Sequence, residues 1–255
     1  MRNLLILFFL TISIQSYAQQ NTAQLKAEFT DAIINKDYDL LVSSAKKLGL
    51  KKTGNHTRYY HDVLKFLPDN AILITNNIED TYALLTIQLY SKYKTSINVV
   101  SIGLMNSSLK YATTQLNTLK INSSFDKTSP SIYLSRILNE TKAKTYISLT
   151  VNPDSYSKFK KDLFIVGLSL EYKATSNYSS LVNFDSSLKE VFFTVQHLTI
   201  EKELYANYLP PLLTLYKLKL KKWGEAKKTK HRILMLSKYL GVEKKVEKIL
   251  ESYEK

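Results

Sequence analysis

The stretch from Ala71 to Asn106 constrains the fold most strongly. A short apolar run, 71–75, leads into a polar loop, 76–80, which is followed by the apolar spacing of a helix as far as about Tyr93. A second apolar run follows at 97–104. Strand, loop, helix and strand in this order form one βαβ unit, whose first loop presents polar groups at a helix start. The sequence therefore predicts an α/β fold with a candidate site in that loop.

The segments around this unit continue the alternation of strands and helices. Before it, helical spacing predicts two short helices joined at Lys36 and Asp37, and a third helix over 59–66. After it, we expect a helix over 108–119, a strand over 144–151, a helix from 156 to about 167 and a strand over 169–173. This order predicts a small parallel or mixed sheet with flanking helices.

The chain changes character near residue 183, where helix-forming residues rich in Lys, Glu and Leu begin. The apolar spacing over 218–237 is typical of a single tetratricopeptide-like hairpin, and a plain helical bundle packed on the α/β part is the alternative. Gly241 then starts a final helix. We expect a signal peptide over 1–18, N-terminal helices over 19–68, an α/β core over 69–182 and a helical region over 183–255.

The first residues have the order of a secretory signal peptide. Arg2 precedes an apolar stretch, 4–14, and small residues ending at Ala18 form a cleavage site. That stretch is shorter than the about 20 residues that span a bilayer, which argues against the alternative of a membrane anchor. We therefore expect cleavage near Ala18 and a periplasmic or secreted product without a transmembrane segment.

Composition excludes several function classes. The chain has no cysteine, which excludes disulfides, thiolate nucleophiles and thiolate metal sites. Its formal net charge of +14 favours an anionic partner or reflects a general bias toward lysine. Arginine, which is preferred for recognising phosphates and base edges, occurs only at Arg2, Arg58, Arg136 and Arg232. We therefore expect no nucleic-acid partner.

The densest group of basic residues lies in the expected C-terminal helices. One interpretation is the solvated face of a helical hairpin, since apolar residues alternate with the lysines. The other is a surface for anionic envelope polymers or lipid head groups. We call this group the basic patch; it consists of Lys219, Lys221, Lys222, Lys227, Lys228, Lys230 and Arg232.

The polar loop of the βαβ unit supplies the candidate ligand-binding residues Asn76, Asn77, Glu79, Asp80 and Thr81. Open α/β sheets bind ligands beyond the carboxyl ends of their strands. Asn and Thr side chains there can hydrogen-bond a sugar or a peptide, and the two carboxylates can bind an amine or a hard cation. The alternative is a structural role, in which Asp80 or Thr81 caps the following helix.

No set of residues typical of a catalytic, metal or cofactor site accompanies this loop. The histidines, His56, His61, His197 and His231, are scattered and lack the spacing of metal ligands. Neither Gly-rich phosphate-binding pattern occurs. We therefore expect no metal and no cofactor.

The βαβ unit also carries a longer pattern that is similar to a known family. It contains Ile74-Thr75-Asn76, Asp80-Thr81-Tyr82, Leu84, Gln88, Val99-Val100, Leu104 and Asn106. These residues resemble the segments LFTNGDNDTYPLWYLQ and DVRVVNLSLLN of the soluble C-terminal region of large polytopic bacterial membrane proteins, the protein O-mannosyltransferase-like family. A weaker similarity covers 145–147 and 167–169. The family's Gly and first Asp are replaced here by Asn77 and Ile78.

The resemblance implies a stand-alone relative of the soluble region, without the membrane part in which the family's transferase chemistry would reside. We therefore expect a non-catalytic binding or accessory module of the bacterial envelope, with an envelope protein or a glycan as its partner. The alternative is a carbohydrate-active envelope enzyme that uses Glu79 and Asp80. Glycoside hydrolysis needs carboxyl groups about 5–10 Å apart across the substrate, so a distant acid, Asp154 or Asp162, would have to approach.

Overall fold

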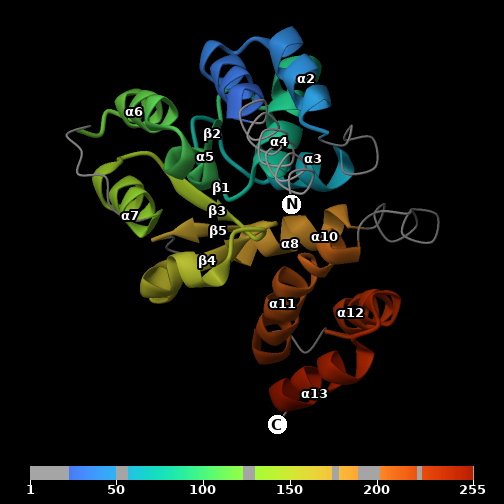
Figure 1. The fold of residues 1–255 in the computed structure, drawn as a ribbon. Coiled ribbons are helices and arrows are strands. Elements are labelled where there is room, and N and C mark those ends of the chain that lie inside the picture. The colour runs from blue at the N-terminus through green and yellow to red at the C-terminus, as the bar shows by residue number, and fades with distance from the viewer. Residues whose placement is uncertain are drawn as a thin grey trace, which may run out of the picture.

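The fold, seen in a computed structural model, is built on a five-stranded mixed sheet with the order β2-β1-β3-β5-β4 (Figure 1). The structure describes residues 23–49, 57–122, 130–173, 178–188, 202–222 and 226–254. The strands are β1 (Ile72–Thr75), β2 (Asn98–Ser101), β3 (Thr145–Ser148), β4 (Leu163–Val166) and β5 (Ser169–Tyr172). The predicted α/β class, a small mixed sheet with flanking helices followed by a helical region, is confirmed.

Helices precede, connect and follow the strands. A helix over 23–35 and α2 (Tyr38–Lys47) are joined at Lys36 and Asp37, as predicted, and α3 (Thr57–Lys65) follows. Within the α/β part lie α4 (Ile78–Ser91), α5 (Ile102–Ser107), α6 (Leu109–Thr118), α7 (Pro130–Glu140) and the 3-10 helix η1 (Pro153–Asp162). The chain continues with α8 (Tyr178–Ser187), α10 (Lys202–Ala206), α11 (Leu209–Lys222), α12 (Lys227–Leu240) and α13 (Glu243–Glu254).

Strand β1 lies at the centre of the parallel part of the sheet, where it pairs with β2 on one side and β3 on the other. All four of its residues are buried, since helices cover both faces of the sheet. Successive side chains point to opposite faces, so Leu73 and Tyr146 belong to one apolar core while Ile74 and Ile147 belong to the other. This double burial explains why these strands read as continuous apolar runs.

The two cores are covered by different helices. The core under Leu73 includes apolar residues of α3, α8, α10, α11, α12 and α13. The core under Ile74 includes the helix over 23–35, α2, α5, α6 and α7. Helix α4 contributes to both cores, through Leu84 and Tyr82 respectively. Figure 1 shows α5 to α7 on one side of the sheet, and α8 and α10 to α13 on the other.

One predicted element is wrong. The helix expected from 156 to about 167 is replaced by η1 and by strand β4. The 3-10 helix begins earlier because Asn152 caps it, its side chain accepting a hydrogen bond from the Asp154 amide at 3.0 Å. Strand β4 then pairs with β5 across the two-residue turn of Gly167 and Leu168, where Gly167 has a φ of +55°.

Two predicted boundaries also shift. The second apolar run was expected to remain extended as far as Leu104, but β2 ends at Ser101, whose hydroxyl accepts a hydrogen bond from the Leu104 amide at 3.2 Å and so starts α5. At the other end of the chain, Gly241 ends α12 with a φ of +75°, and the last helix begins at Glu243.

None of the helices in the described ranges is long and apolar enough to cross a membrane.

Candidate functional site

The candidate site lies at the carboxyl ends of β1 and β3. From β1 the chain passes through α4 to β2 on one side, and then returns through α5 to α7 to β3 on the other side of β1. The connections that leave β1 and β3 therefore diverge, and such a switch point is where open α/β sheets bind ligands. The residues that meet there come from 76–81 after β1 and from 149–152 after β3. We call this region the switch-point site.

Asn77 holds the loop after β1 in place. Its side-chain Oδ1 accepts a hydrogen bond from the Asp80 amide at 2.7 Å, and its carbonyl accepts one from the Thr81 hydroxyl at 2.8 Å. Thr75, the last residue of β1, lies 2.8 Å from the same Thr81 hydroxyl. The predicted cap, Asp80 or Thr81, is therefore wrong: Asn77 caps α4, which begins at Ile78.

Because Asp80 does not cap α4, its side chain is able to point into the fold. Asp80 is 3% exposed, and its Oδ1 accepts a hydrogen bond from the Tyr60 hydroxyl. Its Oδ2 has no hydrogen-bond partner among the described residues. Burial raises the pKa of Asp80 above its usual value, although hydrogen bonds from Tyr60 and Thr150 act in the opposite direction. A carboxyl group that retains an unsatisfied oxygen inside the fold is costly, and such groups cluster at functional sites.

Several hydroxyl groups lie between Asp80 and the C-terminal helices. The hydroxyl of Thr150, a residue that lowers the pKa of Asp80, lies 2.8 Å from the hydroxyl of Ser148. The Tyr59 hydroxyl accepts a hydrogen bond from the side-chain amide of Asn207 at 3.1 Å. Burial raises the pKa of Tyr59, which therefore stays neutral and can act as hydrogen-bond donor and acceptor.

The surface of the switch-point site is polar. Asn77 and Glu79 are exposed and Asn76 is partly exposed, whereas Thr81 is fully buried beneath them. The Asn76 carbonyl accepts a hydrogen bond from the Gly103 amide at 3.0 Å, which ties the loop to the first turn of α5. A Cβ on residue 103 would overlap that carbonyl oxygen, so glycine is required for this close approach. Three of the predicted residues thus face solvent, and two lie inside.

Sequence reasoning missed the residues that surround Asp80. Tyr59 and Tyr60 belong to α3, Thr150 follows β3, and Asn207 lies between α10 and α11. Each is far from the loop in sequence, and no local pattern connects them. The only signal was the pair of adjacent tyrosines at the start of an amphipathic helix that ends just before β1.

The basic patch is divided between buried and exposed positions. Lys219 and Arg232 are mostly buried, and both pair with Asp185 of α8, the Lys219 Nζ at 3.0 Å from Oδ2. Lys219 also donates to the Thr229 hydroxyl at 2.9 Å. Lys230 pairs with Glu254 at 2.6 Å.

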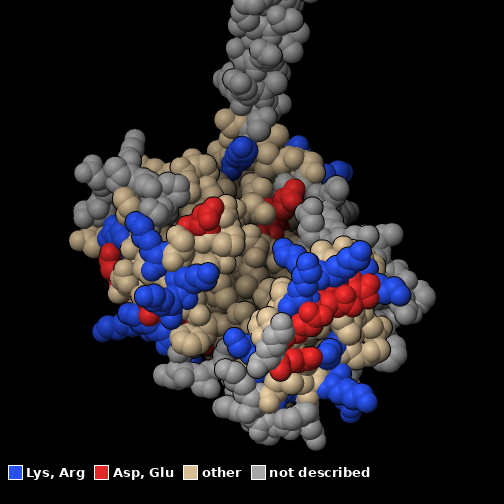
Figure 2. Space-filling view, turned by 90° about the horizontal axis from the view of Figure 1, so that it is seen from below, with Lys and Arg blue, Asp and Glu red and all other residues tan. Residues whose placement is uncertain are grey.

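The remaining residues of the basic patch have fewer described contacts. Lys227 and Lys228 are exposed in the first turn of α12. Lys221 and Lys222 belong to the last turn of α11, and their side chains lie outside the described residues. Figure 2 shows lysine and arginine side chains spread over several areas of the face that bears the C-terminal helices, with acidic side chains among them.

Metal ligands do not gather in the part of the chain that the structure describes. No group of three or more His, Asp and Glu side chains there is arranged to hold an ion. His61 instead stacks on Tyr93, with ring centroids 4.3 Å apart, and burial lowers its pKa. His231 is exposed, and His56 and His197 lie outside the described residues.

The acids considered as partners of Asp80 lie elsewhere. Asp154, in η1, lines a pocket of about 220 Å³ between η1 and α7, together with Arg136. Asp162 is exposed at the end of η1. Among the described residues, no second carboxylate contributes to the raised pKa of Asp80, which comes from burial.

No family model matches the chain, and no curated protein or solved structure is significantly similar to it.

Proposed function

We propose that this chain is a non-catalytic binding module of the bacterial envelope, and that the switch-point site binds a glycan. The observation that carries the proposal is Asp80, a buried carboxyl group with an unsatisfied oxygen, beneath a polar rim at the switch point of the sheet. A group that costs stability at such a position is typical of a functional site.

The chemistry of the rim favours a ligand rich in hydroxyl and amide groups. Asn76, Asn77 and Thr150 offer side-chain donors and acceptors, and Glu79 adds an exposed acceptor. These groups match the hydrogen-bonding groups of sugars and have no positive charge for a phosphate. The signal-like segment that ends at Ala18 supports an envelope location, and the resemblance of the βαβ unit to the soluble region of polytopic membrane proteins supports the same setting.

The surroundings of Asp80 favour binding over catalysis. A glycosidase pair requires two carboxyl groups that share the substrate and influence each other's pKa. The hydrogen-bond partner described for the Asp80 carboxyl group is the Tyr60 hydroxyl, and Glu79, the adjacent residue, is exposed while Asp80 is buried. The carbohydrate-active enzyme is therefore the second candidate, and the experiment below separates the two.

The experiment is a titration of the ¹⁵N-labelled protein with soluble peptidoglycan fragments, in which NMR chemical shifts are recorded at each step. We expect shifts of the side-chain amides of Asn76 and Asn77 and of the backbone amides of 149–152. The double variant Asn76→Ala/Glu79→Ala should weaken binding roughly thirtyfold, since each of the two lost hydrogen bonds costs about 1 kcal/mol. The control Asn139→Ala, at the end of α7 that precedes β3, should bind as the wild type does.

Four results would contradict the proposal. Shifts confined to other parts of the chain, or no binding at millimolar ligand, would exclude a glycan site at this edge. Equal weakening by the Asn139 control would point to general destabilisation. New sugar signals that grow with time would show hydrolysis and favour the enzyme.

A further inference from the structure

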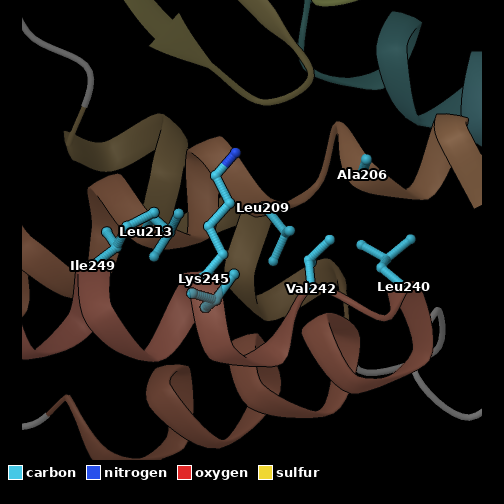
Figure 3. Close-up of a pocket in the computed structure, with 8 residues that line it drawn as sticks. Ala206, Leu209, Leu213, Leu240, Val242, Lys245 and Ile249 are labelled. Atoms are coloured by element: carbon cyan, nitrogen blue, oxygen red, sulfur yellow. The ribbon is translucent and has the colours of Figure 1, made fainter.

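A pocket of about 350 Å³ lies among the C-terminal helices, separate from the switch-point site. Its wall is formed by aliphatic side chains of four segments that meet there: Leu209 and Leu213 from α11, Leu240 from α12, Val242 from the following turn and Ile249 from α13 (Figure 3). None of these side chains can form a hydrogen bond. The pocket therefore offers its occupant apolar contact alone along most of its surface.

The lining is incompletely buried in the chain itself. Leu213, Leu240, Val242 and Ile249 all remain partly exposed, although the first three pack against the core under Leu73. Burial of apolar surface contributes about 25 cal/mol per Å², and the exposed part of this lining does not make that contribution in the protein alone. Concave, largely aliphatic pockets of about 300–1,000 Å³ are the usual form of small-molecule sites. This pocket is near the lower limit, which suits one acyl chain.

The charged residue of the lining is Lys245, whose amine is directed away from α13 at the rim of the pocket (Figure 3). Side chains three or four positions apart are neighbours on a helix. For Lys245 these positions hold Gly241, Val242, Lys248 and Ile249, so no acid of α13 neutralises it. Lys244, by contrast, has Glu247 three positions later. Lys245 also forms no ion pair with a described residue.

We propose that this pocket binds a free fatty acid, with its acyl chain against the aliphatic lining and its carboxylate at Lys245. The volume fits one acyl chain rather than two, and Lys245, the cation among the described lining residues, selects an anionic head group. The carboxylate and the ammonium group attract each other across the rim, where exposure to water keeps the contribution of the pair small. Burial of the acyl chain therefore supplies most of the affinity. Lys245 supplies the preference for a carboxylate over an uncharged head group.

The test is calorimetric titration of the purified protein with sodium laurate, sodium decanoate, dodecanol and dodecyltrimethylammonium, each below its micelle concentration. Laurate should bind best, and each methylene removed should weaken binding about fourfold. Lys245→Glu should weaken laurate about fivefold and strengthen the cationic amphiphile. Lys244→Glu, the matched charge reversal one residue away, should leave laurate binding unchanged. Leu213→Trp should fill the pocket and abolish binding by all the ligands while the far-ultraviolet circular dichroism stays that of the folded protein.

Several results would overturn the proposal. Equal affinity for laurate and dodecanol, or equal laurate binding by the wild type and Lys245→Glu, would remove Lys245 from the site. Full laurate binding by a folded Leu213→Trp variant would place the ligand elsewhere. A concentration-dependent dimer that Leu213→Asp converts to monomer would show that a second copy covers the pocket.

Discussion

The hydroxyl group of Tyr60 donates a hydrogen bond to the Asp80 carboxylate, and so joins α3 to the first turn of α4 beneath the candidate site. The contact connects residues that are 20 positions apart in sequence and are both almost fully buried. It satisfies one oxygen of the carboxyl group and leaves the other without a described partner. The pair therefore stabilises the site and also makes the stability of the protein depend on pH.

Asp80→Asn should stabilise the protein at neutral pH. Because the folded state raises the pKa of Asp80, the proton is bound more tightly in the folded than in the unfolded chain. The stabilisation from that proton is complete below the unfolded value of about 3.9 and is lost as pH rises through the folded pKa. We expect Asp80→Asn to raise the free energy of unfolding at pH 7 by about 1–2 kcal/mol and to change it less at pH 4.

Urea unfolding at both pH values measures the effect of Asp80→Asn. Asp162→Asn, which changes an exposed acid, is the control and should stay within about 0.5 kcal/mol of the wild type. A destabilised Asp80→Asn variant at pH 7 would contradict the argument, because it would show that the ionised carboxylate is well compensated in the folded state.

Tyr60→Phe should have the opposite effect. It removes the donor to Oδ1 and leaves a buried carboxylate with fewer partners, which costs about 1–3 kcal/mol at pH 7. The cost should shrink at pH 4, where protonation relieves the unsatisfied charge. Tyr90→Phe is the matched control, since Tyr90 is 72% exposed, and it should be nearly neutral. Equal losses for the two variants in urea unfolding would rule out a special role of the Tyr60 hydroxyl.

Gly103→Ala should loosen the loop after β1. The added methyl group meets the carbonyl oxygen of Asn76 and separates this loop from α5. Helix propensity alone would favour alanine by about 1 kcal/mol, so the sign of the change reports the contact. We expect a net loss of about 2 kcal/mol in thermal unfolding, with weaker glycan binding. A stabilised variant would show that the loop moves away without cost.

Asp185→Asn should destabilise the C-terminal helices. Asp185 pairs with both Lys219 and Arg232, and all three side chains are less than one fifth exposed. Removing the acid leaves two poorly hydrated cations, at a cost of roughly 3 kcal/mol. The exposed pair of Lys47 and Glu28 provides the control, and Glu28→Gln should cost at most about 1 kcal/mol. Similar losses in chemical denaturation for both variants would mean that Asp185 is effectively solvated.

The central βαβ unit was predictable because its strands are buried on both faces and therefore consist of unbroken apolar runs. The predicted loop residues do meet at one place, but the sequence did not show which of them would turn inward. The orientation of Asp80 depends on Asn77, which caps α4. Because the Asp80 side chain is not needed as the cap, it can accept the hydrogen bond from Tyr60. The partners of Asp80 come from α3, from the segment after β3 and from the C-terminal helices, and such long-range contacts leave no local pattern.

Strand β5 was predicted, but β4, its partner in the hairpin, was missed for a different reason. Strand β4, Leu163–Val166, follows ten residues of 3-10 helix, so the lysines and aromatic residues before it resemble the start of an amphipathic helix. The turn at Gly167 and Leu168, between two short segments rich in aliphatic and aromatic residues, was the available signal.

The core under Leu73 has a consequence for how this chain can be divided. It runs without a break from the sheet through α3 and α8 to Val246 in α13. A fragment that ended near residue 182 would leave Leu73 and Tyr146 facing water, and we expect it to aggregate rather than fold. Substitutions that loosen the packing of the C-terminal helices are therefore expected to lower the stability of the sheet as well.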